Sequence, residues 1–201
     1  MSILIIRHGE TALNAARVVQ PPSTPLNAQG QEQAELLATR LTQFKLGRII
    51  SSDYTRAHMT AVAVQQHQEV PVELEPLLRE RNFGDIRGTP YSELTTDIFD
   101  PDFNPPNGES LGIFDARVSV AWAKMIRIAV NMTSHLALIT HGLVCKSIVK
   151  HQLRQNTKLS EKELDFGNTS LTIVESDIPW KILRFACTDH LRNKKSLGTA
   201  V

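Results

Sequence analysis

Residues 4–14, LIIRHGETALN, join an apolar strand pattern to two adjacent polar side chains. The apolar run of residues 3–6 stops at Arg7 and His8, where an ordinary turn would begin with Gly, Asn or Asp. In an open α/β sheet, ligands bind beyond the carboxyl ends of the strands. A guanidinium next to an imidazole at a strand end therefore predicts a binding or catalytic rim at this edge of the sheet.

The rest of the chain alternates strand-like and helix-like segments. Asn27, Asp53 and Ser110 are the expected N-caps of three helices, and a fourth helix should follow Gly142. Short apolar strands separated by helices predict a mainly parallel sheet covered on both faces, which is a three-layer α/β/α sandwich. Only residues 177–179 separate the last two strands, so these should form an edge hairpin and make the sheet mixed. The strand-like runs lie at residues 2–7, 47–52, 70–75, 135–140, 171–176 and 180–187.

Length and composition indicate an ordinary globular protein. The 201 residues are 41% hydrophobic and 21% charged, with a net charge of +1, which gives no reason to expect nucleic acid or a membrane as a partner. We expect one domain over residues 1–191, with residues 88–110 as a lid-like insertion and residues 192–201 as a disordered tail. The first apolar run is too short for a signal peptide, so a cytoplasmic protein is expected.

The two cysteines, Cys145 and Cys187, lack the spacing of metal ligands. In the cytosol they should be reduced and buried.

Four side chains from three separate strand ends can meet at the same rim: Arg7, His8, Arg56 and His141. Arg56 follows the second strand by about one helical turn, and His141 directly follows the fourth. The planar donors of arginine match a phosphate group, and a neutral imidazole is a competent nucleophile toward phosphorus. A second, protonated histidine can donate to a phosphate oxygen. Alone, Arg56 would be read as a solvated helix residue; its place at a strand end favours a role in binding phosphate.

Several blocks of sequence resemble the histidine phosphatase superfamily, also called phosphoglycerate mutase-like. They follow the family's order over residues 3–145, which makes the resemblance specific. The blocks are LIIRHGETALN, TPLNAQGQEQA (24–34), SSDYTRAHMTA (51–61), LLRERNFGDIRG (77–88), NGES (107–110) and LITHG (138–142). The resemblance implies the phosphoglycerate mutase-like α/β/α fold and phosphoryl-transfer activity without a metal or other cofactor.

The resemblance also implies roles for individual residues. His8 would be the phosphorylated nucleophile, and Glu80 would be the proton donor, which requires a raised pKa. Without the resemblance, Glu80 between Arg79 and Arg81 would be read as part of a surface ion pair. The phosphate and the rest of the substrate would be bound by Arg7, Asn14, Gln20, Arg56, Arg81, His141 and Gly142.

The family contains both phosphatases and mutases. The insertion at residues 88–110 has no Lys or Arg but carries five acids, so like-charge repulsion disfavours bisphosphorylated acids and favours hydrolysis. We therefore expect a phosphomonoesterase whose partner is a small phosphorylated substrate. The sequence ERNFG around Arg81 keeps a phosphoglycerate mutase as the alternative. A protein phosphohistidine or phosphoamino-acid phosphatase is a second alternative, and a non-catalytic phosphate-binding module is a third. The resemblance allows a homodimer.

Overall fold

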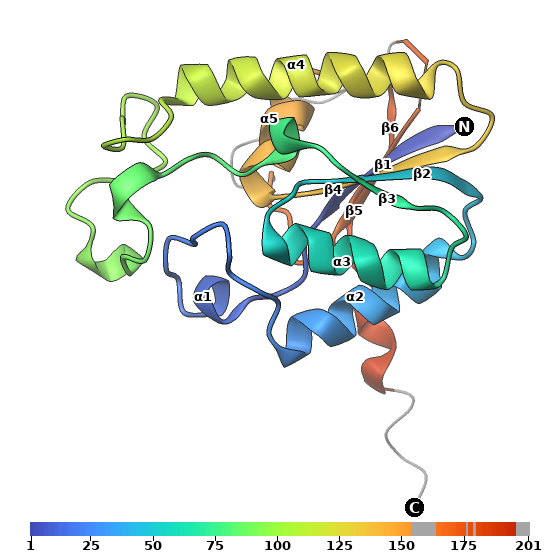
Figure 1. Cartoon of the computed structure of the whole chain (residues 1–201), viewed down its shortest axis with the longest axis horizontal. Helices are drawn as coiled ribbons and strands as arrows, with labels where there is room; N and C mark the ends of the chain where they lie inside the picture. Colours follow the sequence, from blue (N-terminus) through green and yellow to red (C-terminus); the bar gives the residue numbers. More distant parts are fainter. Residues whose placement is uncertain (154–163, 176, 179, 196–201) are drawn as a thin grey trace, which may run out of the picture.

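The computed structural model describes residues 1–153, 164–175, 177–178 and 180–195. They form a six-stranded sheet with the order β3-β2-β4-β1-β5-β6 (Figure 1). The pairs β1/β4, β2/β4 and β2/β3 are parallel, whereas β1/β5 and β5/β6 are antiparallel, which confirms the mainly parallel mixed sheet and its edge hairpin. The strands are β1 (Ser2–Arg7), β2 (Leu46–Ser51), β3 (Val72–Leu74), β4 (His135–Thr140), β5 (Leu171–Glu175) and β6 (Ile182–Cys187).

Helices cover both faces of the sheet, so the three-layer α/β/α architecture is confirmed (Figure 1). Side chains alternate along a strand, and in β1 Ile3 and Ile5 contact one helical layer while Leu4 and Ile6 contact the other. Trp122 of α4 is buried in the first layer, and the helices of the second are α2 and α3. The α-helices are α1 (Ala12–Ala15), α2 (Ala28–Leu41), α3 (Thr55–Gln66), α4 (Leu111–Ala129) and α5 (Gly142–His151).

Two of the three expected helix caps are present. The Asn27 side chain accepts a hydrogen bond from Gly30 N at 2.7 Å, and Ser110 Oγ accepts one from Ile113 N at 3.2 Å. The expectation for Asp53 is wrong, because α3 begins after Tyr54 and the Asp53 carboxylate accepts instead from Arg79 Nε at 2.7 Å.

The segment of residues 88–110 contains a single 3₁₀ turn, η3 (Tyr91–Glu93). It packs on the loop after α1, where Val19 N donates to Thr89 O at 3.0 Å and Gly88 N donates to Val19 O at 2.7 Å. Val19 and Ile98 belong to a small separate apolar cluster. The other 3₁₀ turns are η1 (Pro76–Leu78), η2 (Gly84–Ile86) and η4 (Asp189–Lys195).

The end of the chain is partly described. Residues 192–195, which were expected to begin a disordered tail, continue η4, and residues 196–201 lie outside the described residues. None of the helices in the described ranges is long and apolar enough to cross a membrane. Both cysteines are free thiols; Cys145 is buried as expected, whereas Cys187 is partly exposed.

Candidate active site

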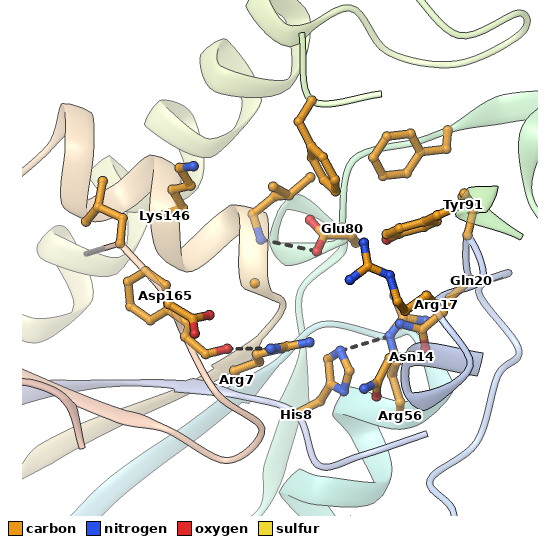
Figure 2. Close-up of a pocket in the computed structure, with 17 residues that line it drawn as sticks. Arg7, His8, Asn14, Arg17, Gln20, Arg56, Glu80, Tyr91, Lys146 and Asp165 are labelled. Atoms are coloured by element: carbon orange, nitrogen blue, oxygen red, sulfur yellow. Dashed lines mark hydrogen bonds between the residues drawn. The ribbon is translucent and has the colours of Figure 1, made fainter. Parts of the chain in front are cut away.

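A cavity of about 510 Å³ lies at the carboxyl ends of the parallel strands (Figure 2). Each of those strands leads into a segment that contributes to it. Arg7 ends β1 and His8 follows it, Arg56 is in the first turn of α3 after β2, and Gly142 begins α5 after β4. Of the residues expected at the site, the cavity brings together Arg7, His8, Asn14, Gln20, Arg56, Glu80 and Gly142, but neither His141 nor Arg81 is part of its lining.

The hydrogen bonds of His8 fix its tautomer. Its Nδ1 lies 2.7 Å from the carbonyl oxygen of Gly9, which can only accept, so Nδ1 carries the proton. Arg56 Nε donates to His8 Nε2 at 3.1 Å, so Nε2 presents a lone pair. Burial, with smaller contributions from Arg56 and Arg7, holds the pKa of His8 well below its ordinary value. The imidazole is therefore neutral, with one nitrogen ready to act as a nucleophile.

The loop that carries two consecutive prolines orients Arg56. Arg56 Nη1 donates to the carbonyl of Pro21 at 3.2 Å, and Thr55 N donates to the carbonyl of Pro22 at 3.1 Å. Burial lowers the pKa of Arg56 to about 10, which leaves the guanidinium charged at neutral pH. The proline loop thus holds the start of α3 and points the guanidinium at His8.

Arg7 is held from the other side of the cavity. Its Nη1 donates to the carbonyl of Phe166, in the segment before β5, while its buried Nε has no hydrogen-bond partner among the described residues. An unpartnered buried N–H in the residue next to a neutral imidazole is suited to an anionic ligand. Arg7 and Arg56 therefore flank His8 with two fixed positive charges (Figure 2).

Close backbone contact fixes the loop that follows His8. A Cβ atom on Gly9 would overlap the carbonyl of Gly30 at the start of α2. Thr11 N donates to Asn14 Oδ1 at 2.7 Å, and the Thr11 hydroxyl donates to Gln20 Oε1 at 2.7 Å, so Thr11 holds both amide side chains at the cavity.

Glu80 faces the cavity from the segment after β3. One carboxylate oxygen accepts from Arg81 N at 3.0 Å and the other from Leu143 N at 3.2 Å. Burial raises the pKa of Glu80, although these two N–H donors and the charges of Arg56 and Arg7 oppose the shift. A fixed carboxyl with a raised pKa is suited to general acid–base catalysis, as the resemblance implies.

His141 lies behind His8 and does not line the cavity. Its ring meets the His8 ring edge-on, with the two centroids 5.2 Å apart, and its Nε2 lies 2.8 Å from Ser52 Oγ. Burial, then the positive charge of Arg56, holds the pKa of His141 well below its ordinary value. The imidazolium form of His141 expected from the sequence is therefore disfavoured in this state, first because the ring is fully buried and then because Arg56 and Arg7 add positive charge nearby. The neutral ring can still donate through one nitrogen.

Arg81 is placed differently from the expectation. It is buried, and its guanidinium donates to three backbone carbonyls at 3.0, 3.2 and 2.6 Å. All of its acceptors lie in residues 98–109, so Arg81 fastens this segment to the body of the protein and does not reach a substrate in the cavity. The acceptors are Glu109 O, Ile98 O and Phe103 O.

Further side chains line the cavity beyond those of the sequence motifs. The Arg17 guanidinium lies 5.6 Å from the centre of the Tyr91 ring, and both side chains reach the cavity (Figure 2). Lys146 is on α5, one turn after Gly142, and this helical spacing could have identified it. Asp165 and Phe166 also line the cavity, but no motif marks them.

The described part of the chain has no cluster of three or more His, Cys, Asp or Glu side chains arranged to hold a metal ion. The site instead gathers cations, an imidazole and a carboxyl group around one cavity. This combination can bind a phosphate, attack its phosphorus atom and move a proton.

Comparison with known proteins agrees with this chemistry. The model of the histidine phosphatase superfamily (branch 1) matches residues 3–186, so the chain belongs to this superfamily of phosphoryl-transfer enzymes. A probable phosphoglycerate mutase GpmB from Escherichia fergusonii is 30% identical over an aligned length of 185, and the alignment covers 87% of this chain and 85% of the relative. A fructose-2,6-bisphosphatase TIGAR from Xenopus laevis is 33% identical over an aligned length of 121, and the alignment covers 55% of this chain and 44% of the relative.

A solved structure of YhfR from Bacillus stearothermophilus matches with a TM-score of 0.83 and 25% identity. The match covers 94% of this chain and 98% of the YhfR chain. The phosphoglycerate mutase-like fold expected from the sequence is thereby confirmed.

Proposed function

We propose that the protein is a metal-independent phosphomonoesterase that hydrolyses a small phosphorylated metabolite through a phosphohistidine on His8. The observation that carries this proposal is the nitrogen at the floor of the cavity. This nitrogen is His8 Nε2, which presents a lone pair because the Gly9 carbonyl holds the ring proton on Nδ1, and the guanidiniums of Arg56 and Arg7 flank the ring. Arg7 and Arg56 supply the positive charge that phosphoryl transfer requires.

In the first step, the phosphate oxygens bind the two arginines, and Arg56 Nε turns from His8 to a phosphate oxygen. His8 Nε2 then attacks phosphorus. A nitrogen–phosphorus bond forms, the bond to the ester oxygen breaks, and Glu80 gives its proton to the departing alkoxide.

In the second step, Glu80 takes a proton from a water molecule that attacks the phosphorus of phospho-His8. The oxygen–phosphorus bond forms, the bond to nitrogen breaks, and inorganic phosphate leaves. Both arginines remain charged throughout. Glu80 ends protonated and His8 ends neutral, so the site returns to its starting state.

Residues 88–110 contribute Tyr91 and Phe99 to the cavity lining but none of their five acids, so their negative charge favours hydrolysis over the mutase reaction by repelling a bisphosphorylated acid on its approach. Asp97 and Asp100 are exposed and accept hydrogen bonds within their own turns, from Phe99 N at 2.9 Å and Asp102 N at 2.8 Å. Glu109 does not add to this repulsion, because Arg117 pairs with it at 2.7 Å.

A phosphoglycerate mutase remains the second candidate because of two further cations. Arg17 and Lys146 line the cavity in addition to Arg7 and Arg56. They would suit a second anionic group on the substrate, such as a carboxylate. The name of the Escherichia fergusonii relative points the same way.

Two assays test the proposal. The protein should release phosphate from p-nitrophenyl phosphate at mildly acidic pH, and excess EDTA should leave the rate unchanged. With 3-phosphoglycerate, phosphate release without 2-phosphoglycerate would support the hydrolase, whereas conversion to 2-phosphoglycerate would support the mutase. Loss of all activity in EDTA would contradict the metal-independent mechanism.

The proposal includes a cytoplasmic setting. In that compartment the two free thiols, Cys145 and Cys187, stay reduced.

A further inference from the structure

The turn of residues 167–170, which leads into β5, holds the backbone of His8. The carbonyl oxygen of His8 accepts two hydrogen bonds from this turn, one from Thr169 N at 3.2 Å and one from Asn168 Nδ2 at 3.2 Å. Phe166, just before the turn, supplies the carbonyl that holds Arg7. The placement of both His8 and Arg7 therefore depends on where this turn lies.

The turn is held in an unfavourable conformation. Thr169 is fully buried and has φ of +53°, in the left-handed region that β-branched residues rarely adopt. Surrounding contacts must hold such a residue, because its own backbone preference does not.

Besides the backbone bond to His8, a side-chain contact from the C-terminal 3₁₀ turn η4 holds Thr169. His190 is buried, and its Nε2 lies 3.0 Å from Thr169 Oγ1. Thr188, just before η4, packs near Gly167 of the same turn. Figure 1 shows this C-terminal turn, coloured red, beside the helical layer formed by α2 and α3.

Hydrogen bonds link Arg40, His190, Thr169 and the carbonyl of Asn168 in series, and the guanidinium at one end and the carbonyl at the other determine the direction of each bond. Arg40 Nη1 lies 3.1 Å from His190 Nδ1, and a guanidinium can only donate, so Nδ1 accepts and Nε2 carries the proton. His190 Nε2 thus donates to Thr169 Oγ1, which in turn donates to the carbonyl of Asn168 at 2.8 Å. Burial and Arg40 lower the pKa of His190 to about 4, so the ring stays neutral near pH 7.

We propose that His190 is a positioning residue for phosphoryl transfer: through Thr169 it holds the turn that fixes the carbonyl of His8 and the guanidinium of Arg7. This inference rests on the proposed function of His8. Its essential link is the bond between His190 and Thr169, and the bond from Arg40 serves to fix the tautomer.

Two near-isosteric variants separate the two bonds of His190. In His190→Gln the amide nitrogen can replace Nε2 and still donate to Thr169. In His190→Asn the amide oxygen can replace Nδ1 and accept from Arg40, but no atom reaches Thr169. We expect the Asn variant to lose about tenfold in kcat, because small displacements of reacting groups are costly, while the Gln variant keeps most of the activity.

Thr169→Val removes the hydroxyl group without changing the shape of the residue. It should lower kcat as much as His190→Asn, and the double variant should be no slower than either single variant, because both break one chain of bonds. Arg192→Ala is the control, since it removes a mostly exposed ion pair with Asp189 in the same 3₁₀ turn and should leave kcat unchanged.

Hydrogen exchange of the Thr169 amide provides a readout that does not depend on activity. This N–H bonds to the His8 carbonyl, so its exchange should accelerate in His190→Asn but not in His190→Gln. The proposal is overturned if His190→Asn keeps the wild-type kcat and the wild-type rate of amide exchange while only its melting temperature falls. It is also overturned if the loss of kcat in the double variant equals the product of the losses in the two single variants. An inactive wild-type protein with the expected exchange pattern would refute the proposed function alone.

Discussion

His8→Ala is expected to lower kcat for phosphomonoester hydrolysis by about 10⁴-fold or more. The substitution removes the nitrogen that attacks phosphorus, and among the described residues lining the cavity no other imidazole is present to replace it. Arg7 and Arg56 remain, so phosphate or a substrate should still bind with an affinity similar to that of the wild-type protein. The measurement is steady-state kinetics together with phosphate binding by calorimetry.

His58→Ala is the matched control, since His58 is exposed on α3 and should be dispensable for kcat. Equal thermal stability of wild-type and variant proteins would show that the loss is chemical. If a folded His8→Ala protein kept more than a small fraction of wild-type kcat, His8 would not be the nucleophile.

Glu80→Gln should have the second-largest effect, and its size should depend on the leaving group. An alkyl phosphate needs a proton on its departing oxygen, so kcat should fall by about 10²- to 10⁴-fold. The p-nitrophenolate ion leaves without that proton, so the first step should survive with p-nitrophenyl phosphate. The second step still needs a base for water. Stopped-flow absorbance should therefore show a burst of nitrophenolate followed by slow turnover.

The pKa shifts also predict the pH profile of kcat/KM. Burial, Arg56 and Arg7 lower the pKa of His8, so the nucleophile stays neutral as the pH falls below 6.5 and the acid limb moves to lower pH. Burial raises the pKa of Glu80, so its acid form persists to higher pH than a free carboxyl group would allow. Activity toward an alkyl phosphate should fall on the alkaline side as Glu80 loses its proton, and Glu80→Gln should abolish this limb.

Glu35→Gln serves as the control, because Glu35 is an exposed residue of α2 that pairs with His67. It should change neither the burst nor the pH profile. Equal losses of kcat for both substrates, without a burst, would mean that Glu80 supports binding or folding and not proton transfer.

Much of the fold could be predicted because its signals are local. Apolar runs marked all six strands, and the side chains of Asn27 and Ser110 marked two helix starts. The prediction that Asp53 caps a helix was wrong because its carboxylate pairs with Arg79, which is 26 residues away in the chain. A carboxylate can cap a helix or pair with a distant arginine, and only the folded structure decides between them.

The side-chain members of the site were largely predictable, whereas their backbone partners were not. Motifs and strand ends identified Arg7, His8 and Arg56. The carbonyls that orient them belong to Gly9, Pro21 and Phe166, and a carbonyl carries no residue-specific signal in a sequence.

Arg81 shows the converse case. Its motif matched the family, but carbonyls of a neighbouring segment bind its guanidinium and turn it away from the cavity. Sequence patterns indicate where an arginine lies along the chain, but the direction of a long side chain depends on the acceptors around it.

The proposed mechanism transfers a phosphoryl group to Nε2 of His8. The most direct test mixes the Glu80→Gln protein with p-nitrophenyl phosphate, quenches the reaction in alkali, and locates the phosphoryl group by fragmentation mass spectrometry and by NMR of the imidazole nitrogens. We expect one phosphoryl group per chain, attached to Nε2 of His8. Phosphorylation of Nδ1 or of another residue, or an active wild-type enzyme whose Glu80→Gln form never becomes labelled, would contradict it.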